Sequence, residues 1–288
     1  MFAQFYQALR RFNMRRKQVR GWLATELRRR KRRTVPHVVG VLAIMKNESH
    51  TIDEWISHYL SIGVDRIFLI DNGSTDDTVA KAWLWIEKMR GGAVVNLVEY
   101  PEQHRQQAHY WSAFQEFKIA ELCEWLMIAD LDEFWFCKDG GPIDDYLRGH
   151  SGTDVIYTNW SQFGSNGHVA QPESLRTGFT QRDPKLDRHT KSIFRTYIAD
   201  RADSIRVHHV MRASPFRIRT ENKHLQLNHY ATQSRDYWFN VKMKRGDAVC
   251  AARDLAELAR RFDILNANAT FEDTLLSERV GEGEGIRP

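Results

Sequence analysis

The stretch WLMIADLDEFWF, residues 125–136, decides the fold, because an apolar run ends there in a group of acidic side chains. The apolar run predicts a buried strand. Asp130, Asp132 and Glu133 follow at once; carboxylates this close repel one another, and partial burial costs them hydration. Alternation along an extended chain points Asp130 and Asp132 to one side, where a hard divalent cation would relieve both costs. A solvated turn at the end of the strand is the simpler interpretation.

Strands and helices alternate, with short links, before this stretch. Apolar runs predict strands at residues 37–45, 66–70 and 93–98, and the polar and apolar spacing predicts helices at 51–63, 77–90 and 106–121. Thr51 and Glu54 fit a capping box at the start of the first helix. The alternation predicts an α/β protein with a mostly parallel central sheet and helices on both faces.

Polar residues follow three of the predicted strands. The carboxyl ends of parallel strands form one edge of a sheet, and ligands bind there. This edge is expected to gather Asn47 and Glu48, Asp71 and Asn72, and Asp130 and Asp132. The turns contain no GxGxxG and no GxxxxGK[ST] sequence, so neither the dinucleotide fingerprint nor the P-loop is present.

The formal net charge of +5 is unevenly distributed along the 288 residues. Residues 1–35 contain 12 Lys and Arg against one Glu, net +11, which leaves 30 basic and 36 acidic residues, net −6, for the rest. Aromatic residues recur at helical spacing in this basic arm. The pattern favours an anionic membrane surface as the partner of residues 1–33. Nucleic-acid binding and a solvated arm are the alternatives, and no nucleic acid is expected.

The three cysteines form no CxxC pair, which indicates free thiols in a reducing compartment. No apolar run is long enough to span a bilayer. Together with the basic arm, these features predict a cytoplasmic protein that associates peripherally with the inner face of the cell membrane.

The order of several motifs resembles that of GT-A glycosyltransferases of the family 2-like kind, close to family 92. The matching stretches before residue 137 are MKNES, EWISHYLSIGVDRIFLIDNGSTDDT and WLMIADLDEFW. Those after it are NWSQFGSNGH, KSIFR, the pair His208-His209 and LNHYATQSRDYWFNVKMKRGDA. The resemblance covers about residues 37–250 and leaves the arm and the C-terminal tail outside.

The resemblance implies a GT-A-like fold with a Rossmann-like nucleotide-binding half and an acceptor half. The expected divisions are a basic arm (1–35), a nucleotide-sugar-binding half (36–150), an acceptor-binding half with closing helices (151–263) and a flexible tail (264–288). The implied reaction is Mn²⁺- or Mg²⁺-dependent transfer of a hexose from a nucleotide diphosphate-sugar to a hydroxyl of a glycan or lipid-linked acceptor. The family-2 kinship implies inversion, and surface polysaccharide or glycolipid synthesis is the expected context.

Roles for individual residues follow from the resemblance. The nucleotide-sugar is expected to contact Asn47, Glu48, Asp71, Asn72, Asp130 and Lys191. Asp130, Asp132 and His229 are expected to hold the metal, with His208 and His209 as reserve candidates for the imidazole ligand. An unperturbed His229 would gain a proton and stop ligating between about pH 6 and 7.

The acceptor side is less determined. Trp160, Phe163 and His168 are candidates for acceptor contacts, although core packing explains any one aromatic ring equally well. Asp183, Glu173 and Asp187 lie in the same part of the chain, and Asp183 is the favoured catalytic base. Glu133 is expected to orient the metal site from behind.

Two other classes of protein share single features of this sequence. A haloacid-dehalogenase-type phosphatase also carries Asp-x-Asp at a strand end, but on its first strand and with a later Gly-Asp-x-x-x-Asp pair. Here Gly246-Asp247 is followed by Ala251 in place of the second Asp. A non-enzymatic membrane- or nucleic-acid-binding adaptor would leave the gathered carboxylates unexplained.

Overall fold

A computed structural model describes residues 27, 38–89, 94–102, 105–245 and 254–280 of the chain. The basic arm expected at residues 1–35 lies outside the described residues apart from Leu27. Within the described part, no helix combines the length and apolar character needed to cross a bilayer.

The first half is built from four parallel strands. They are β1 (Val39–Met45), β2 (Arg66–Asp71), β3 (Val94–Glu99) and β4 (Trp125–Ile128), in the spatial order β3-β2-β1-β4. The helices that connect them are α2 (Ile52–Ser61), α3 (Thr78–Lys88), α4 (Gln106–Glu116) and α5 (Ile119–Leu122). The strands and helices predicted before residue 125 are present with ends shifted by a few residues, except that the helix predicted at 106–121 is divided into α4 and α5 at Lys118, whose φ is 51°.

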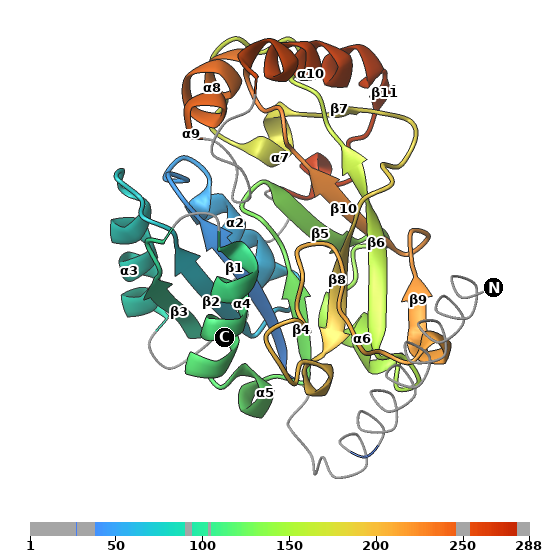
Figure 1. The fold of residues 1–288 in the computed structure, drawn as a ribbon. Helices are drawn as coiled ribbons and strands as arrows, with labels where there is room; N and C mark the ends of the chain where they lie inside the picture. Colours follow the sequence, from blue (N-terminus) through green and yellow to red (C-terminus); the bar gives the residue numbers. More distant parts are fainter. Residues whose placement is uncertain (1–26, 28–37, 90–93, 103–104, 246–253, 281–288) are drawn as a thin grey trace, which may run out of the picture.

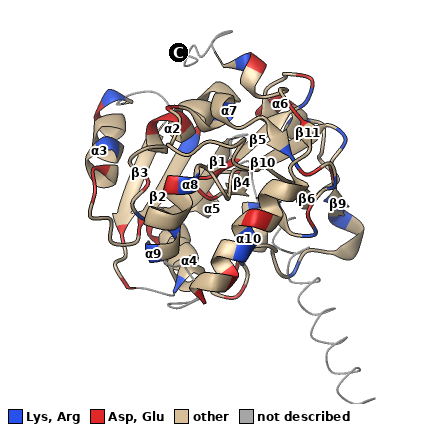
Figure 2. Cartoon of the chain, turned by 90° about the horizontal axis from the view of Figure 1, so that it is seen from above, with Lys and Arg blue, Asp and Glu red and all other residues tan. Residues whose placement is uncertain are grey.

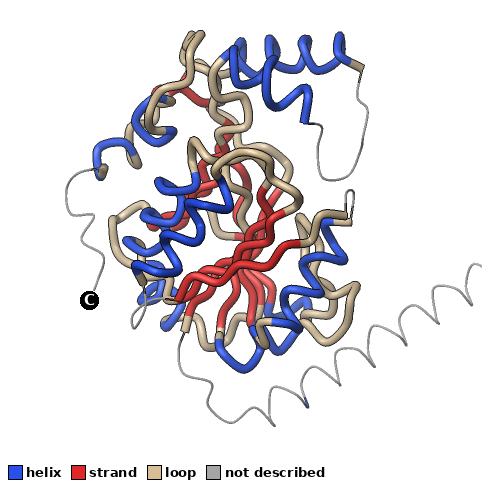
Figure 3. Tube along the Cα trace, turned by 90° about the vertical axis from the view of Figure 1, so that its left-hand side faces the viewer, coloured by secondary structure: helices blue, strands red, loops and turns tan. Residues whose placement is uncertain are grey.

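Side chains of β1 alternate between two cores, one on each face of the sheet. Val41 and Ala43 pack with Trp55 and Ile56 of α2, whereas Leu42 belongs to the core on the other face, with α4 and α5. A strand that is apolar on both faces must be covered on both, which is why helices lie on the two sides of the sheet in Figure 3. The predicted α/β class is confirmed.

The second half continues the same sheet with mixed strand directions. Its strands are β5 (Glu133–Cys137), β6 (Val155–Gln162), β8 (Thr190–Arg195), β9 (Ile218–Thr220) and β10 (Leu225–His229). The sheet order continues β4-β8-β6-β10-β5, with β9 parallel to β6. The two halves thus share one nine-stranded sheet, and five of its eight strand pairings are parallel.

Smaller elements complete this half. They are α6 (Ile143–Arg148), α7 (Leu175–Gly178), α8 (Arg235–Tyr237), the π-helix η3 (Trp238–Lys242), α9 (Met243–Arg245) and α10 (Leu255–Asn268). Within the described residues, 3₁₀ turns lie at Thr196–Ile198, Pro215–Arg217 and Ser277–Arg279. Helices α8 and α10 lie at one end of the sheet, above β10 in Figure 1 and across the strands in Figure 2. We call the segment from α8 to α9 the cap.

Two sequence-based expectations were wrong. Thr51 makes no side-chain cap on α2, and Glu54 instead accepts hydrogen bonds from the N-terminus of α7, at 2.7 Å from the Leu175 N–H. Glu54 therefore caps α7, a helix far away in the sequence, and not its own helix. The tail expected from residue 264 is ordered as far as the described chain reaches: α10 runs to Asn268, β11 (Phe271–Glu272) pairs with β7 (Gln181–Arg182), and Arg279 donates to the Cys137 carbonyl.

Candidate active site

Asp130 and Asp132 lie in a turn between β4 and β5, not on an extended strand as the sequence indicated. The Glu133 N–H closes the turn on the Asp130 carbonyl at 3.0 Å. Helix α2 holds the turn from below, because the indole N–H of Trp55 donates to the same carbonyl at 2.9 Å. The turn gives the two aspartates different partners: Asp130 binds Lys191, and Asp132 binds Lys242.

Asp130 belongs to a cluster that we call the interior cluster: Asp130, Glu133 and Lys191. The Lys191 ammonium, on β8, lies 2.7 Å from Asp130 Oδ2 and 3.3 Å from Glu133 Oε2, and both Lys191 and Glu133 are fully buried. Burial raises the pKa of Glu133 to about 8, even though Lys191 acts in the opposite direction. Burial alone would lower the pKa of Lys191, but the two carboxylates raise it above its usual range. A charged lysine therefore supports Asp130 from beneath.

Asp132 belongs to a second group, the cap cluster: Asp132, His229 and Lys242. His229 Nε2 lies 3.6 Å from Asp132 Oδ1, and the Lys242 ammonium donates to Asp132 Oδ2 at 3.0 Å. His229 reaches this place because the antiparallel pairing of β10 with β5 sets it opposite Glu133. Lys242 reaches it from η3, and π-helical turns are frequent at functional sites.

A metal fits this site only in part. Asp132 and His229 offer an oxygen and a nitrogen on one side of the cap cluster, a suitable pair for Mn²⁺. The Gln162 side chain contacts His229 Nδ1 at 3.0 Å, which leaves Nε2 toward Asp132. Asp130 is engaged by Lys191 instead. Over the ranges that the structure describes, no three His, Cys, Asp or Glu side chains form a metal-binding group, so the expected three-ligand set is not assembled.

In the structure, His229 gains a proton at a lower pH than the sequence indicated. Burial lowers the pKa of His229 to about 4, although Asp132 acts in the opposite direction. The imidazole is therefore neutral at pH 6 to 7, where the sequence alone indicated a change of charge. A neutral imidazole is the form that ligates metals.

The predicted nucleotide-binding residues do come together at the strand ends. Asp71 accepts from the N–H groups of Gly73 and Ser74 at 2.9 and 3.0 Å, so its carboxylate shapes its own loop. Asn72 donates to the Tyr100 and Glu102 carbonyls, and Asn47, with φ of 54°, accepts from the Thr75 N–H. Glu48 accepts from the Tyr237 hydroxyl of the cap at 3.3 Å.

A cavity of about 680 Å³ lies between the exit of β1 and the cap. Asn47, Ser49, His50, Asp76 and Gln171 line it from the sheet side, and Asp236, Tyr237, Asn240, Val241 and Lys244 line it from the cap side. The His50 ring lies 4.7 Å from that of Tyr237. The volume lies within the range typical of small-molecule sites.

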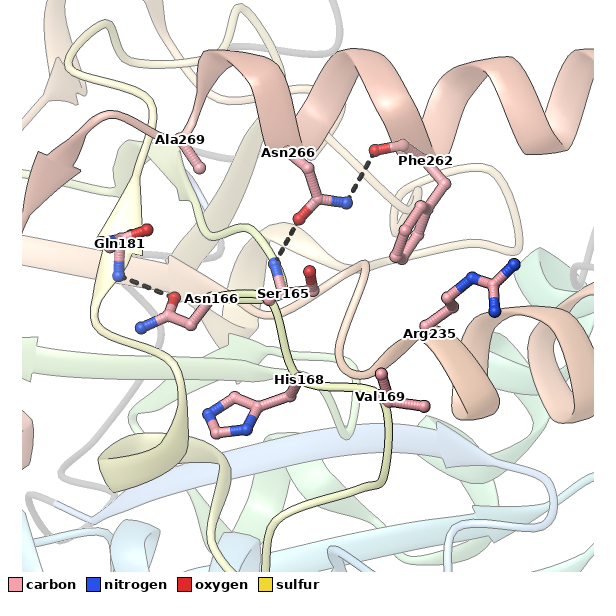
Figure 4. Close-up of a pocket in the computed structure, with 10 residues that line it drawn as sticks. Ser165, Asn166, His168, Val169, Gln181, Arg235, Phe262, Asn266 and Ala269 are labelled. Carbon is pink, nitrogen blue, oxygen red and sulfur yellow. Dashed lines mark hydrogen bonds between the residues drawn. The ribbon is translucent and has the colours of Figure 1, made fainter.

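A smaller cavity of about 250 Å³ lies between the loop after β6 and α10. The polar residues that line it form hydrogen bonds with one another (Figure 4): Asn266 accepts from the Ser165 N–H, and Asn166 accepts from the Gln181 N–H. His168, an expected acceptor contact, lines this cavity, and its Nε2 lies 2.9 Å from the Gly178 carbonyl.

The two aromatic acceptor candidates differ in position. Phe163 is 1% exposed and packs on Tyr230 in the core, so its ring is not presented to a ligand. Trp160 is 8% exposed and lies against three imidazoles, with its centroid 4.1 Å from that of His229 and 5.2 Å from those of His189 and His208.

The carboxylates expected as catalytic base or as its support lie in different places. Asp183 accepts from the Lys185 N–H at 2.8 Å in an exposed loop, and Glu173 is exposed in the loop before α7. Glu133 lies behind Asp130 and accepts from its N–H at 3.0 Å, as expected of a residue that orients the site. His208 contacts the Thr190 carbonyl through Nδ1 at 3.1 Å.

Sequence reasoning missed Lys242 and His189. Lys242 had no local signal, since a lysine on a helix is usually solvated. His189 did have one: Asp187 precedes it by two residues, close enough for a hydrogen bond between the side chains, which the structure shows at 2.6 Å.

Comparison with known proteins places the chain among glycosyltransferases. The sequence model of glycosyltransferase family 92 matches residues 37–264. A family 92 protein of Ricinus communis is 26% identical over 211 residues, which cover 69% of this chain and 36% of that protein. One of Oryza sativa subsp. japonica is 31% identical over 165 residues, or 55% of this chain and 27% of that protein. The chain thus spans about a third of the length of these curated relatives.

Among solved structures, S. aureus TarS (residues 1–349) is similar at 14% sequence identity. The match has a TM-score of 0.42 and covers 84% of this chain and 70% of that one.

Proposed function

Because the chain belongs to glycosyltransferase family 92, we propose that it transfers a sugar from a nucleotide diphosphate-sugar to a hydroxyl of a glycan or lipid-linked acceptor. The observation that carries the proposal is the cap cluster, in which Asp132, His229 and Lys242 converge from three separate segments. Family membership favours this reaction over the phosphatase and the adaptor.

The donor would lie along the strand ends, between the 680 Å³ cavity and the cap cluster. The base and ribose would face Asn47, Glu48 and the Asp71–Asn72 loop. Asp130 is 31% exposed and held by Lys191 at 2.7 Å, so its carboxylate keeps a fixed orientation toward a bound ribose. The diphosphate would reach the cap cluster.

Asp132 and His229 would hold the Mn²⁺ or Mg²⁺ ion, which supplies a Lewis acid for the leaving diphosphate when bound. Lys242 carries a second positive charge at the same place. Its ammonium also donates to the Ala231 carbonyl at 2.7 Å, which holds it over Asp132. A cation next to developing negative charge stabilises the transition state.

Inversion at the anomeric carbon and a role in surface polysaccharide or glycolipid synthesis are part of the proposal and rest on the family 2-like resemblance. A peripheral position at the inner face of the cell membrane rests on the basic arm. Deletion of residues 1–33 is expected to release the protein from anionic vesicles and to leave donor hydrolysis unchanged. Sedimentation of the truncated protein with the vesicles would contradict that position.

The proposed reaction is tested with a panel of nucleotide sugars. Each is offered to the full chain with Mn²⁺, Mg²⁺ or a chelator, and thermal stabilisation and release of nucleotide diphosphate are measured. We expect at least one donor to stabilise the protein and to be hydrolysed only with metal. Release that is equal in the presence of the chelator would remove the metal from the proposal, and stabilisation by none of the donors would overturn donor binding.

A further inference from the structure

Asp187 and His189 form a hydrogen-bonded pair in the loop before β8. His189 Nδ1 lies 2.6 Å from Asp187 Oδ1, and the His189 backbone N–H donates to the same oxygen at 2.8 Å. An ionised carboxylate only accepts, so Nδ1 carries a hydrogen, and in the neutral ring Nε2 then has the lone pair. Partial burial alone would raise the pKa of Asp187, but the hydrogen bonds from His189 lower it below its usual value, which keeps the carboxylate ionised.

The backbone of β6 fixes this pair in place. The Asp187 N–H donates to the Trp160 carbonyl at 2.9 Å, and the Trp160 N–H donates to the His189 carbonyl at 3.2 Å. The Asn159 side chain adds a third link, to the Asp187 carbonyl at 2.8 Å. A carboxylate and an imidazole tied to the same strand keep a constant geometry, which a catalytic pair requires.

Trp160 connects the pair to the cap cluster. The centroid of its ring lies 5.2 Å from that of His189 and 4.1 Å from that of His229. His229 in turn lies 3.6 Å from Asp132. The His189 side chain is 41% exposed, whereas His229 is 9% exposed. An accessible imidazole thus stands one indole away from the proposed diphosphate site.

We propose that His189 is the general base of the transfer and that Asp187 positions it, an inference that rests on the proposed glycosyl transfer. The acceptor oxygen bonds to the anomeric carbon as its proton passes to His189 Nε2. The bond from the anomeric carbon to the diphosphate oxygen breaks, and its electron pair leaves with the diphosphate. Asp187 stabilises the imidazolium through Nδ1–H, and the imidazolium returns its proton to solvent.

The other carboxylates are placed less well for this task. Asp183 uses Oδ1 to order its own loop through the Lys185 N–H. Glu173 lies beside α7, whose N-terminus binds Glu54 of α2. His189 and Asp187, in contrast, are both tied to the backbone of Trp160.

The test uses the nucleotide sugar that the wild-type chain hydrolyses fastest. His189→Ala is expected to lower kcat at least 100-fold, the usual contribution of general base catalysis. The affinity for the matching nucleotide diphosphate with Mn²⁺, measured by thermal shift, should stay within twofold. Added imidazole should restore part of the lost kcat in His189→Ala, which a purely structural role would not allow.

Asp187→Asn and Asp183→Asn form a matched pair. Asp187→Asn is expected to lower kcat at least tenfold with KM within twofold, because the imidazole loses its orienting acceptor. Asp183→Asn should leave both parameters within twofold. Wild-type turnover in His189→Ala, or a greater loss in Asp183→Asn than in His189→Ala, would overturn the assignment while the proposed function stands. A wild-type chain that hydrolyses no nucleotide sugar would overturn both.

Discussion

The interior cluster and the cap cluster each bind one aspartate of the same turn to one lysine, but their surroundings differ. Lys191 is fully buried and reaches Asp130 from a central strand, whereas Lys242 is 25% exposed and reaches Asp132 from the cap. Removal of Lys191 would take the counter-charge from the buried interior, whereas water can reach the partly exposed ammonium of Lys242 and take part of its place. We therefore infer that the interior cluster maintains the shape of the site and that the cap cluster carries its chemistry.

This contrast also changes the argument for a metal. From the sequence, repulsion among three carboxylates called for a divalent cation. In the structure, two ammonium groups already relieve that repulsion. The case for a metal therefore rests on the Asp132–His229 pair and on the leaving diphosphate, and not on the stability of the folded chain.

The largest expected effect separates the two lysines by stability. Lys191→Met should reduce the free energy of unfolding by about 3 kcal/mol, because Asp130 loses its buried counter-charge and Glu133 loses the ammonium that lies 3.3 Å from its Oε2. Lys242→Met should cost less than about 1 kcal/mol. Urea unfolding of both variants at one pH measures the difference, and equal losses would remove the distinction between the clusters.

The next effect concerns turnover. Asp132→Asn keeps the shape of the side chain and removes its charge, so metal-dependent hydrolysis should fall about 100-fold, or about 2.7 kcal/mol in activation free energy. The melting temperature should change little, because the substitution also relieves the repulsion between Asp132 and its neighbouring carboxylates. Near-normal turnover with an unchanged metal requirement would rule Asp132 out as the principal ligand.

The interior cluster also predicts a pH dependence. Since the pKa of Glu133 rises from 4.5 to about 8 on folding, the folded state binds a proton more tightly, and its contribution to stability is complete below about pH 4.5. That contribution is lost as pH rises toward 8, by at most about 1.4 kcal/mol per pH unit.

Glu133→Gln should remove this loss, because the amide does not ionise. The measurement is urea unfolding of metal-free wild type and variant at pH 5, 6, 7 and 8. Two parallel stability curves would show that Glu133 has an ordinary pKa.

The smallest effect sharpens the role of His229. His229→Ala should raise the Mn²⁺ concentration for half activity about tenfold, equivalent to about 1.4 kcal/mol. His208→Ala is the matched control, because His208 also lies against Trp160 but turns its Nδ1 to the Thr190 carbonyl. A tenfold rise in His208→Ala and none in His229→Ala would move the ligand to His208.

Local sequence pattern determined the first half of this protein. Continuous apolar runs such as VVGVLAIM need cover on both faces, and short links leave few arrangements other than parallel strands with helices between them. The same pattern located the strand exits, so Asn47, Asp71 and Asp132 were predicted at one edge without knowledge of the fold. His229 was found because the family resemblance carries a histidine at that motif.

Tertiary structure decided everything that depends on contacts between distant segments. Glu54 caps α7 and not its own helix. The N-terminus of α7 offers it the backbone N–H groups of Leu175 and Arg176, whereas a capping box in α2 would offer a single N–H. Lys191 and Lys242 come from positions 61 and 110 residues away from the aspartates they bind. No local rule encodes such a pairing, since it depends on strand order, on register and on one π-helical turn. The sequence therefore determined where the acidic groups lie, and only the folded chain decided which cations and which base meet them.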